Sequence, residues 1–547
     1  EQAPGVLATV TATLARGEKL LALEVPAMSN ARIIPGDLAI PGVPARTLAM
    51  AACAGEYESA SLVILPVDDV SGLLVTPSDL TCDAGTIPAA NVDVKLVKVW
   101  YQAGRSIGDL KHKQLVPELL VNDDALVRVD IEAGANYLRS TAEDGTETYM
   151  LASDPNPESG HLDGVRPIDA DTLQPLNLPA LRSQQYWVTV QVPDDAAAGE
   201  YSGALQIASA GAEATVVPMT ISVRPFALEA CPLTYSVYYR ARLVADNQPT
   251  ITSEGRSEEQ YLAEMKHLQS HGVLYPTTYQ GYDETLLPRT FQLREEAGLP
   301  SDTVYTLGVT TGAPASQEAL DALVGRVEQY IALAKEYGCE QVYFYGIDEA
   351  KGDRLAAQKA AWRILQEKGA RTFVACYKGT FEAMGSLLNV AVLAHVPDPV
   401  EAEKFHGVGS RVFTYAFPQV GPEESETFRR NYGLYLWQAG FDGCMDYAYQ
   451  HGFGHVWNDF DSNRYRDHNF AYPTVNGVVG TVQIEGYREA SDDVRYMATL
   501  LTAIDKCEDA DAKAAAQAWI DDLDVSRNLY EVRAEMVAHI LACKGLN

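Results

Sequence analysis

The sequence lacks clustered cysteines and any strong metal-binding pattern. Its eight cysteines are widely scattered and none forms a C-x-x-C pair, so neither a zinc site nor a dense disulfide scaffold is indicated. His451 and His455 have the spacing of two ligands on one helical face, but Gly452 and Gly454 would interrupt that helix. We therefore expect no metal site and no cofactor.

Long apolar runs are also absent. No stretch reaches the roughly 18–20 consecutive apolar residues that a transmembrane helix needs, so we expect no membrane span. The chain begins at Glu1 with neither a methionine nor a signal peptide, which either processing or a chosen start point explains. We expect a protein that is secreted or periplasmic.

Positive charge is scarce. The 42 lysines and arginines stand against 74 aspartates and glutamates, which gives a formal net charge of −32 at pH 7. So acidic a surface repels nucleic acid and anionic membranes, and we expect neither as a partner. It suits a neutral substrate held by short-range contacts. The composition does not indicate an oligomeric state.

The length and the residue pattern predict several domains. A chain of 547 residues is too long for one typical hydrophobic core. In residues 1–226, short runs alternate apolar and polar side chains, and we predict an antiparallel β-sandwich there. The clearest runs are residues 92–100, 125–131, 186–192, 201–207 and 215–223. Residues 153–182 are too polar for a core and predict a long surface loop.

From residue 227 to 490, strand-like and helix-like segments alternate. This rhythm favours a (β/α)8 barrel of the TIM type over a doubly wound sheet. Nine segments compete for its eight strand positions: residues 233–239, 273–279, 303–309, 341–345, 372–377, 391–396, 411–417, 443–449 and 478–485. Either one of them is an extra strand or one is not a strand. Residues 491–547 predict C-terminal helices packed on the barrel.

The stretch QVYFYGIDEA, residues 341–350, carries the chemistry. A buried strand ends at Gly346, and two neighbouring acids, Asp348 and Glu349, follow at once. In a barrel of this kind the carboxyl ends of the strands hold the active site, and paired carboxylates there point to glycoside hydrolysis. A solvated junction between strand and loop is the alternative, because Asp and Glu are common at such junctions.

The adjacency of the two acids suggests a particular mechanism. Most glycosidases place their two acids on separate elements, about 5–5.5 or 6.5–9.5 Å apart. Neighbouring acids suit substrate-assisted hydrolysis, in which the sugar's own 2-acetamido group is the nucleophile. One acid then protonates the leaving oxygen, and its neighbour accepts a hydrogen bond from the amide N–H. The like charges also raise one pKa, which keeps one acid protonated near neutral pH.

Aromatic and polar residues at other strand ends could contact a sugar. The candidates are Tyr377, His395, Tyr415, Tyr447, Trp457, Asn458, Asp459 and Glu485. Sugar rings stack on aromatic side chains, and amide, carboxylate and phenol groups bond to sugar hydroxyls. Some of them also have a structural interpretation: rim packing for the tyrosines, a core or rim position for His395, and an ion pair with Arg488 for Glu485.

Several motifs together resemble the catalytic domain of glycoside hydrolase family 123 and related barrel proteins of unknown function. They are YGIDEA, LYLWQAGFDGCMDYAY, the Trp-Asn-Asp loop and GTVQIEGYREASDDVRY, preceded by QQYWVTVQVPDDAAAGEYSGALQI, which is similar to the β-sandwich of such proteins. The resemblance implies a β-N-acetylgalactosaminidase-like enzyme. Asp348 would orient the acetamido group, Glu349 would be the general acid/base, and the tyrosines with Trp457 would line the pocket. Ile484 stands before Glu485, where relatives usually carry Trp.

Three hypotheses follow. The first is an exo-acting retaining hexosaminidase that releases terminal β-linked N-acetylhexosamine from a glycan, N-acetylgalactosamine being favoured, with galacto or gluco preference open. The second is a glycosidase of other specificity, in which Asp446, Asp459 or Glu485 is a conventional nucleophile or base. The third is a glycan-binding protein without catalytic activity.

Overall fold

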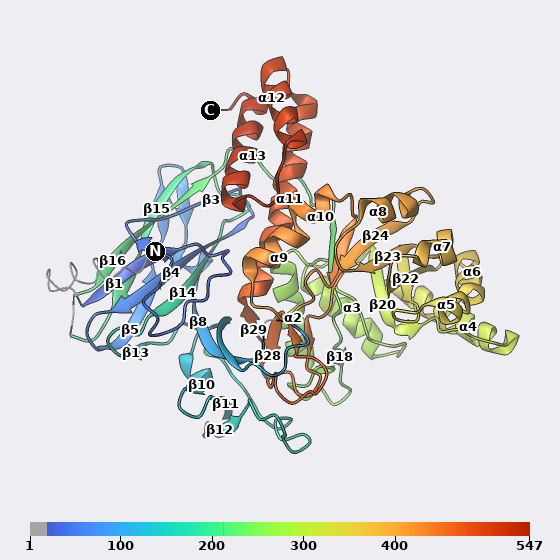
Figure 1. Ribbon diagram of the computed structural model, residues 1–547, viewed down its shortest axis with the longest axis horizontal. Coiled ribbons are helices and arrows are strands. Elements are labelled where there is room, and N and C mark those ends of the chain that lie inside the picture. Colours follow the sequence, from blue (N-terminus) through green and yellow to red (C-terminus); the bar gives the residue numbers. More distant parts are fainter. Residues whose placement is uncertain (1–18, 105, 212, 547) are drawn as a thin grey trace.

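The computed structural model describes residues 19–104, 106–211 and 213–546 (Figure 1). In Figure 1 the N-terminal sheets lie on the left, the alternating strands and helices on the right, and the C-terminal helices rise between them. Within the described ranges, none of the helices combines the length and the apolarity that crossing a bilayer requires.

The N-terminal part contains two large sheets that share one core. The first has the order β2-β1-β4-β14-β8-β9-β29-β28, with β1 Leu20–Val25, β2 Val43–Pro44, β4 Tyr57–Pro66, β8 Val92–Gln102, β9 Gln114–Val121, β14 Gln184–Gln191, β28 Ala471–Pro473 and β29 Val478–Thr481. All its pairs are antiparallel. Leu62 and Val188 of this sheet pack with Leu205 and Met219 of the second sheet, because alternate side chains of each strand point inward.

The second sheet has the order β13-β5-β15-β16-β3 and is antiparallel except between β16 and β3. Its strands are β3 Leu48–Ala52, β5 Val70–Pro77, β13 Leu176–Leu178, β15 Gly199–Ala208 and β16 Thr215–Val223, with β6 Leu80–Cys82 and β7 Gly85–Ile87 attached. A three-stranded sheet comprises β10 Val127–Asp130, β11 Ala135–Thr141 and β12 Glu147–Leu151.

A curled, fully parallel sheet forms the centre of the second part. Its order is β17-β25-β24-β23-β22-β21-β20, with β17 Thr234–Val237, β20 Thr303–Thr310, β21 Gln341–Tyr345, β22 Arg371–Cys376, β23 Val390–Ala394, β24 Arg411–Tyr415 and β25 Gly443–Asp446. Residues 275–278 connect its two edges through backbone hydrogen bonds. The amides of Tyr275 and Thr277 donate to β17, at 3.3 and 3.1 Å, and the amide of Thr278 donates to Tyr305 of β20 at 2.9 Å.

Helices alternate with these strands and then continue at the C-terminus. They are α2 Glu258–Ser270, α3 Leu286–Glu296, α4 Gln317–Glu336, α5 Gly352–Ala356, α6 Lys359–Glu367, α7 Thr380–Met384, α8 Pro399–His406, α9 Ser425–Tyr432, α10 Leu434–Gln438, α11 Val482–Lys506, α12 Ala510–Asp521 and α13 Leu529–Lys544. Two small ladders join β18 Arg242–Leu243 to β19 Gly255–Arg256, and β26 Gln450–His451 to β27 His468–Asn469. A capping box begins α2, in which Ser257 and Gln260 are bonded reciprocally.

Two of the nine strand candidates are not strands of the parallel sheet. Residues 273–279 contain only an isolated bridge, between Thr278 and Thr306, and Pro276 among them has no amide hydrogen for a ladder. Residues 478–485 do not extend the parallel sheet: β29 ends at Thr481, pairs antiparallel with β9, and α11 begins at Val482. Because α11 is buried on nearly every side in its first half, its apolar residues show no clear helical stripe in the sequence. The predicted domain limits at residues 226 and 490 stay a prediction. The structure adds that residue 490 lies within α11 and that β28 and β29 complete an N-terminal sheet.

Candidate active site

The two acids follow β21 on a tightly held turn. Ile347 donates its amide to Gln358 Oε1 at 2.6 Å, and the amide of Glu349 donates to the carbonyl of Ala375 on β22 at 3.0 Å. Glu349 has φ of +48°, in the left-handed region that side chains other than glycine rarely adopt. These hydrogen bonds therefore hold Glu349 in an unfavourable backbone conformation that orients its side chain, as is common at functional sites.

Asp348 and Glu349 both line a cavity of about 350 Å³. Its other lining residues are Tyr238, Arg240, Tyr279, Leu307, Tyr345, Ala375, Tyr415, Gln419, Tyr447 and Phe453. Five tyrosines and one phenylalanine surround the two carboxylates, whose side chains stay accessible to solvent. No further acid lines the cavity among residues that the structure describes.

Two tyrosine hydroxyl groups, hydrogen-bonded in series, hold the carboxyl group of Asp348. Tyr345 Oη donates to Asp348 Oδ1 at 2.6 Å, and Tyr238 Oη donates to Tyr345 Oη at 3.3 Å. Although Asp348 is partly exposed, the walls of the cavity shield its carboxyl group from much of the solvent. This partial burial raises the pKa of Asp348 and the negative charge of Glu349 adds to that effect, while the hydrogen bond from Tyr345 opposes it. Asp348 is therefore held in one orientation beside a second carboxylate.

Glu349 is bound by two other phenols. Tyr377 Oη donates to one carboxylate oxygen and Tyr415 Oη donates to the other. Burial, followed by the bond to Glu349, raises the pKa of both phenols above their ordinary value, so both stay protonated donors at neutral pH. Lys351 Nζ lies 3.7 Å from the ring centre of Tyr377. Each oxygen of the carboxylate thus has a defined partner.

Arg240 and Tyr447 form another wall of the cavity. Arg240 Nη1 donates to Tyr447 Oη at 2.9 Å, and Nη2 is bonded to Glu254. Tyr447 Oη also lies 2.8 Å from Nδ1 of His451, whose pKa burial lowers to about 4. Arg240, Tyr238 and Tyr279 also line the cavity, but none of them is among the site residues predicted from the sequence. The available signal was position, because Arg240 directly follows the predicted strand 233–239, at the same end as the acids.

The structure places the predicted sugar-contact residues unequally. Tyr415 and Tyr447 line the cavity, and Tyr377 reaches it through Glu349. His395 is exposed, with its ring centre 6.5 Å from that of Tyr377, and it is absent from the lining. Glu485 lies in the first turn of α11, where it pairs with Arg488 at 2.6 Å and His271 at 3.2 Å, as the ion-pair alternative anticipated.

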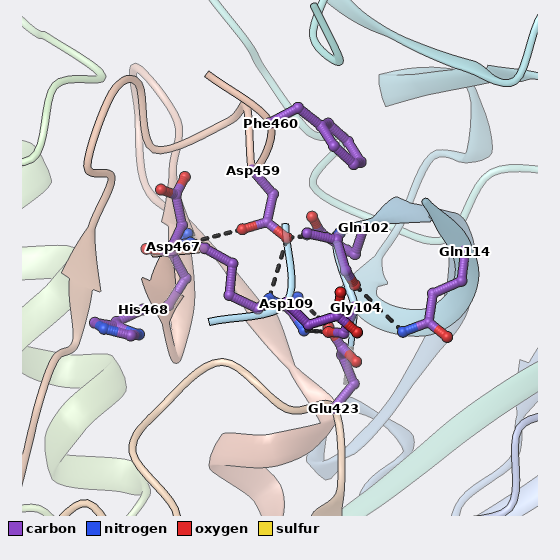
Figure 2. Close-up of polar contacts among 12 residues, drawn as sticks. Gln102, Gly104, Asp109, Gln114, Glu423, Asp459, Phe460, Asp467 and His468 are labelled. Carbon is purple, nitrogen blue, oxygen red and sulfur yellow. Dashed lines mark hydrogen bonds and ion pairs between the residues drawn. The ribbon is translucent and has the colours of Figure 1, made fainter. Parts of the chain in front are cut away.

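The Trp-Asn-Asp loop points away from this cavity. Trp457 is buried in the N-terminal core, 6.0 Å from Trp100 between ring centres, and Asn458 donates to the carbonyl of Asp154 at 2.9 Å. Asp459 accepts the amides of Ala103, at 2.8 Å, and of Asp467, at 2.6 Å (Figure 2). It also pairs with Arg466, at 3.1 Å, which in turn binds Glu423. These three side chains attach the loop to the N-terminal sheets, so the structure does not bring them to the acids.

The candidate nucleophiles of the second hypothesis also lie outside the lining. Asp446 is fully buried at the end of β25, where its Oδ1 accepts the amides of Ala416 and Tyr447, both at 2.9 Å. Burial raises the pKa of Asp446 to about 7. Asp459 and Glu485 are held in the ion pairs described above. In the described part of the chain, no cluster of three or more His, Cys, Asp or Glu side chains has the arrangement of a metal site.

Comparisons with known proteins include an informative match among solved structures. No protein-family model and no curated protein matches the sequence. The alignment with a xyloglucanase of glycoside hydrolase family 5 from Bacteroides ovatus covers 82% of this chain and 98% of that chain. Its 8% identity and TM-score of 0.28 are too low to indicate a shared fold. A family 123 glycoside hydrolase from Clostridium perfringens, solved in a study of glycolipid glycan hydrolysis, has a TM-score of 0.63 and 11% identity over 96% of this chain and 97% of its own. Over nearly its whole length, this chain therefore shares a fold with a family 123 glycoside hydrolase.

Proposed function

We propose that this protein is an exo-acting, retaining glycoside hydrolase that releases a terminal β-linked N-acetylhexosamine, with N-acetylgalactosamine favoured. One observation carries the proposal: among the described residues, Asp348 and Glu349 are the only acids in the lining of the cavity of about 350 Å³, which is large enough for a sugar. A conventional mechanism needs a second acid on another element, and the cavity lining offers none. The sugar's own acetamido group is the nucleophile that remains.

The proposed fold is a (β/α)8 barrel behind an N-terminal β-sandwich. Residues 275–278 take the eighth position of the barrel, because their hydrogen bonds join both edges of the parallel sheet. The cavity residues Arg240, Glu349, Tyr415 and Tyr447 then all follow or end barrel strands on the same, carboxyl-terminal side. Active sites of such barrels lie on this side. The similarity of fold to the family 123 enzyme supports the same assignment.

In the proposed first step, protonated Glu349 donates its proton to the glycosidic oxygen. The acetamido carbonyl oxygen attacks C1 as the bond from C1 to the leaving oxygen breaks, and an oxazolinium ion forms. Asp348 accepts the hydrogen bond of the amide N–H and stabilises the positive charge that develops there. Tyr345 orients Asp348 for this task, and its bond is 2.6 Å in the free protein.

In the proposed second step, Glu349 acts as the base. It takes a proton from water, whose oxygen attacks C1 and reopens the oxazolinium ring, which restores the acetamido group. Two displacements at C1 retain the β configuration. Tyr377 and Tyr415 occupy both oxygens of Glu349 in the free protein. In the first step, the glycosidic oxygen must therefore displace one of these phenols from Glu349. Tyr377 is half-buried and Tyr415 is buried, so Tyr377 is the more accessible of the two.

A panel of nitrophenyl glycosides tests the function. We expect cleavage of β-N-acetylgalactosaminide or β-N-acetylglucosaminide, and at most trace cleavage of the matching β-galactoside and β-glucoside. Cleavage of both classes at equal rates would contradict the role of the acetamido group. A lasting covalent adduct with a 2-fluoro glycoside would indicate an enzyme nucleophile, and binding of N-acetylhexosamine without turnover would indicate a glycan-binding protein.

Substitution of each acid tests the division of roles. We expect Glu349→Gln to lower kcat by about 10²–10⁴-fold, the size of a general-acid contribution. The loss should be smaller for dinitrophenyl leaving groups, because they depart with little protonation. Asp348→Asn should lower kcat for every leaving group alike, since it acts on the acetamido group. A thiazoline mimic of the oxazoline should inhibit the wild type, and identical leaving-group profiles for both variants would refute these assignments.

A further inference from the structure

The cavity has a polar wall that the proposed mechanism does not use. Arg240 follows β17 and Tyr447 follows β25, and these two strands are hydrogen-bonded neighbours. Asp348 and Glu349 follow β21. In the ring of seven strands plus residues 275–278, β25 and β21 lie four positions apart in either direction. The Tyr447 side chain therefore enters the cavity from the side opposite the acids. Arg240 enters beside it, because β17 is the neighbour of β25 and lies three positions from β21 by the shorter way.

This wall offers both a hydrogen-bond donor and a second bonding position. A guanidinium group only donates, so Tyr447 Oη must accept the 2.9 Å bond from Arg240 Nη1. A hydroxyl group can form three hydrogen bonds, one through its proton and two through its lone pairs. The 2.8 Å contact with His451 uses a second of these on Tyr447 Oη, and one is left for a ligand. Nη1 carries two protons and has a single partner among the described protein groups. A hydroxyl group, which both accepts and donates, fits a guanidinium N–H and a phenol oxygen placed side by side.

The surroundings of Arg240 favour a neutral group over an anion. Nη2 of Arg240 forms an ion pair with Glu254, and its guanidinium lies 5.5 Å from the ring centre of Tyr279. The arginine side chain is about one-fifth exposed, with a side-chain relative accessibility of 21%. Because Glu254 offsets its charge and the same cavity holds Asp348 and Glu349, a sulfate or carboxylate would gain no net attraction there. Directional hydrogen bonding is what the arginine provides.

We propose that Arg240 and Tyr447 together bind one free hydroxyl of the terminal sugar and so determine which sugar is accepted. This inference rests on the proposed function. With C1 and the 2-acetamido group at Asp348 and Glu349, the far side of the pyranose, which carries the hydroxyls at C4 and C6, faces Arg240. A substituent on that hydroxyl would collide with the wall and lose both hydrogen bonds. The pair thereby restricts the enzyme to unsubstituted non-reducing ends.

The first experiment uses the wild-type enzyme and nitrophenyl N-acetylhexosaminides that lack one hydroxyl, at C3, C4 or C6 in turn. We expect kcat/KM to fall at least tenfold for one of the C4 and C6 analogues, because a site built to bind a hydroxyl rejects a sugar without it. The O-methyl derivative at that position should not be hydrolysed measurably. Losses below threefold for both the C4 and C6 analogues would overturn the inference.

The second experiment compares the parent and deoxy substrates in two arginine variants. Arg240→Met should lower kcat/KM at least tenfold on the parent sugar and less than threefold on the critical deoxy sugar, because the lost bond is already absent there. Arg242→Met is the matched control. Arg242 binds the same Glu254 at 3.1 Å but is about half exposed and outside the cavity lining, so we expect no change in selectivity.

The outcomes separate the two proposals. If the wild type cleaves no N-acetylhexosaminide, the proposed function fails and this inference fails with it. If the wild type is active but Arg240→Met loses the same factor on every substrate, Arg240 only holds Tyr447 and Glu254 in place. Arg240→Lys keeps the positive charge but loses the planar guanidinium group with its paired N–H donors. The ratio of kcat/KM on the parent sugar to that on the deoxy sugar should therefore resemble that of Arg240→Met and not that of the wild type. A wild-type selectivity profile in the lysine variant would also overturn the inference.

Discussion

At the scale of single residues, phenol groups determine how the two acids are held. Asp348 has one phenol partner, Tyr345, and Glu349 has two. A phenol that donates to a carboxylate favours its charged form, whereas burial disfavours it. For Asp348 burial is the larger effect, so its pKa is raised despite Tyr345. Tyr345 thus affects the protonation of Asp348 as well as its orientation.

Tyr345→Phe tests this adjustment. The hydrogen bond from Tyr345 lowers the pKa of Asp348, so its removal should raise that pKa further. Because the proposed mechanism needs ionised Asp348, the acidic limb of the pH profile of kcat/KM should move to higher pH.

Tyr343→Phe is the control for that measurement. Tyr343 lies on the same strand, but its hydroxyl donates to Gln341, at 3.1 Å, away from the cavity. We expect its acidic limb to stay in place. An unchanged limb in Tyr345→Phe, or an equal displacement in both variants, would contradict the role of Tyr345.

At the scale of elements, glycines let helices α9, α10 and α11 pack closely against one another. Gly486 of α11 lies against α9, and a Cβ atom there would come within 2.1 Å of the carbonyl oxygen of Ser425. Gly433, between α9 and α10, approaches Ala490 of α11 in the same way, since its Cβ would lie 3.1 Å from that residue's Cα. Glycine costs helical stability but permits backbones to approach this closely.

A pair of glycine substitutions separates these two effects. Gly325 of α4 is exposed and nothing lies within 4 Å of its Cβ position, so Gly325→Ala should stabilise the protein by about 0.5–1 kcal/mol through helix propensity. Gly486→Ala gains the same propensity but forces two backbones apart, at a cost of about 1–3 kcal/mol or more. Thermal unfolding midpoints should therefore move in opposite directions. A rise in both would show that α9 and α11 can separate without cost.

At the scale of the whole molecule, a buried ionic network joins three parts of the chain. Asp493 of α11 binds Arg429 of α9 and Arg533 of α13, both at 2.7 Å, and Arg533 also lies 3.4 Å from Glu58 of β4. Glu56 lies beside this network and accepts a bond from Tyr496 at 2.8 Å. Such pairs offset the desolvation of their charges only when the whole network forms, so they favour one arrangement of the three parts.

Glu56→Gln tests how protonation affects this network. Burial, with the charge of Asp492 adding to it, raises the pKa of Glu56 to about 8 from an ordinary value of 4.5, although Arg533 acts against the rise. Between these two pH values the folded protein keeps a proton that the unfolded chain releases, so Glu56 contributes progressively less stability as pH rises. Glutamine cannot ionise. The unfolding midpoint of Glu56→Gln minus that of the wild type should therefore increase from pH 5 to pH 8.

Subtracting the wild-type unfolding midpoint from that of the variant cancels the contributions of the other titrating groups. The half-buried His451 and the buried His455 act in the opposite sense. Burial lowers both pKa values to about 4, so below pH 6.5 the unfolded chain binds protons at these residues that the folded protein does not. These contributions are common to variant and wild type and cancel. Glu259→Gln, on the exposed face of α2, is the control for the loss of one carboxylate outside the buried network.

The sequence by itself determined the local features of this protein. The strand over residues 341–345, the two acids after it and the capping box of α2 follow from periodicity and turn chemistry, which act between residues close in the chain. Strand-end position likewise identified Tyr415 and Tyr447, because parallel strands bring their carboxyl ends to one side of a sheet.

Only the tertiary structure decided which polar side chains face the cavity and which support the core. Trp457 and Asp459 read as sugar contacts in the sequence, but their partners Trp100 and Ala103 lie more than 350 residues away and draw them into the N-terminal core. Arg240, by contrast, enters the cavity because β17 lies beside β25. A side chain's role depends on what surrounds it, and contacts between distant parts of the chain leave no periodic signal in a single sequence.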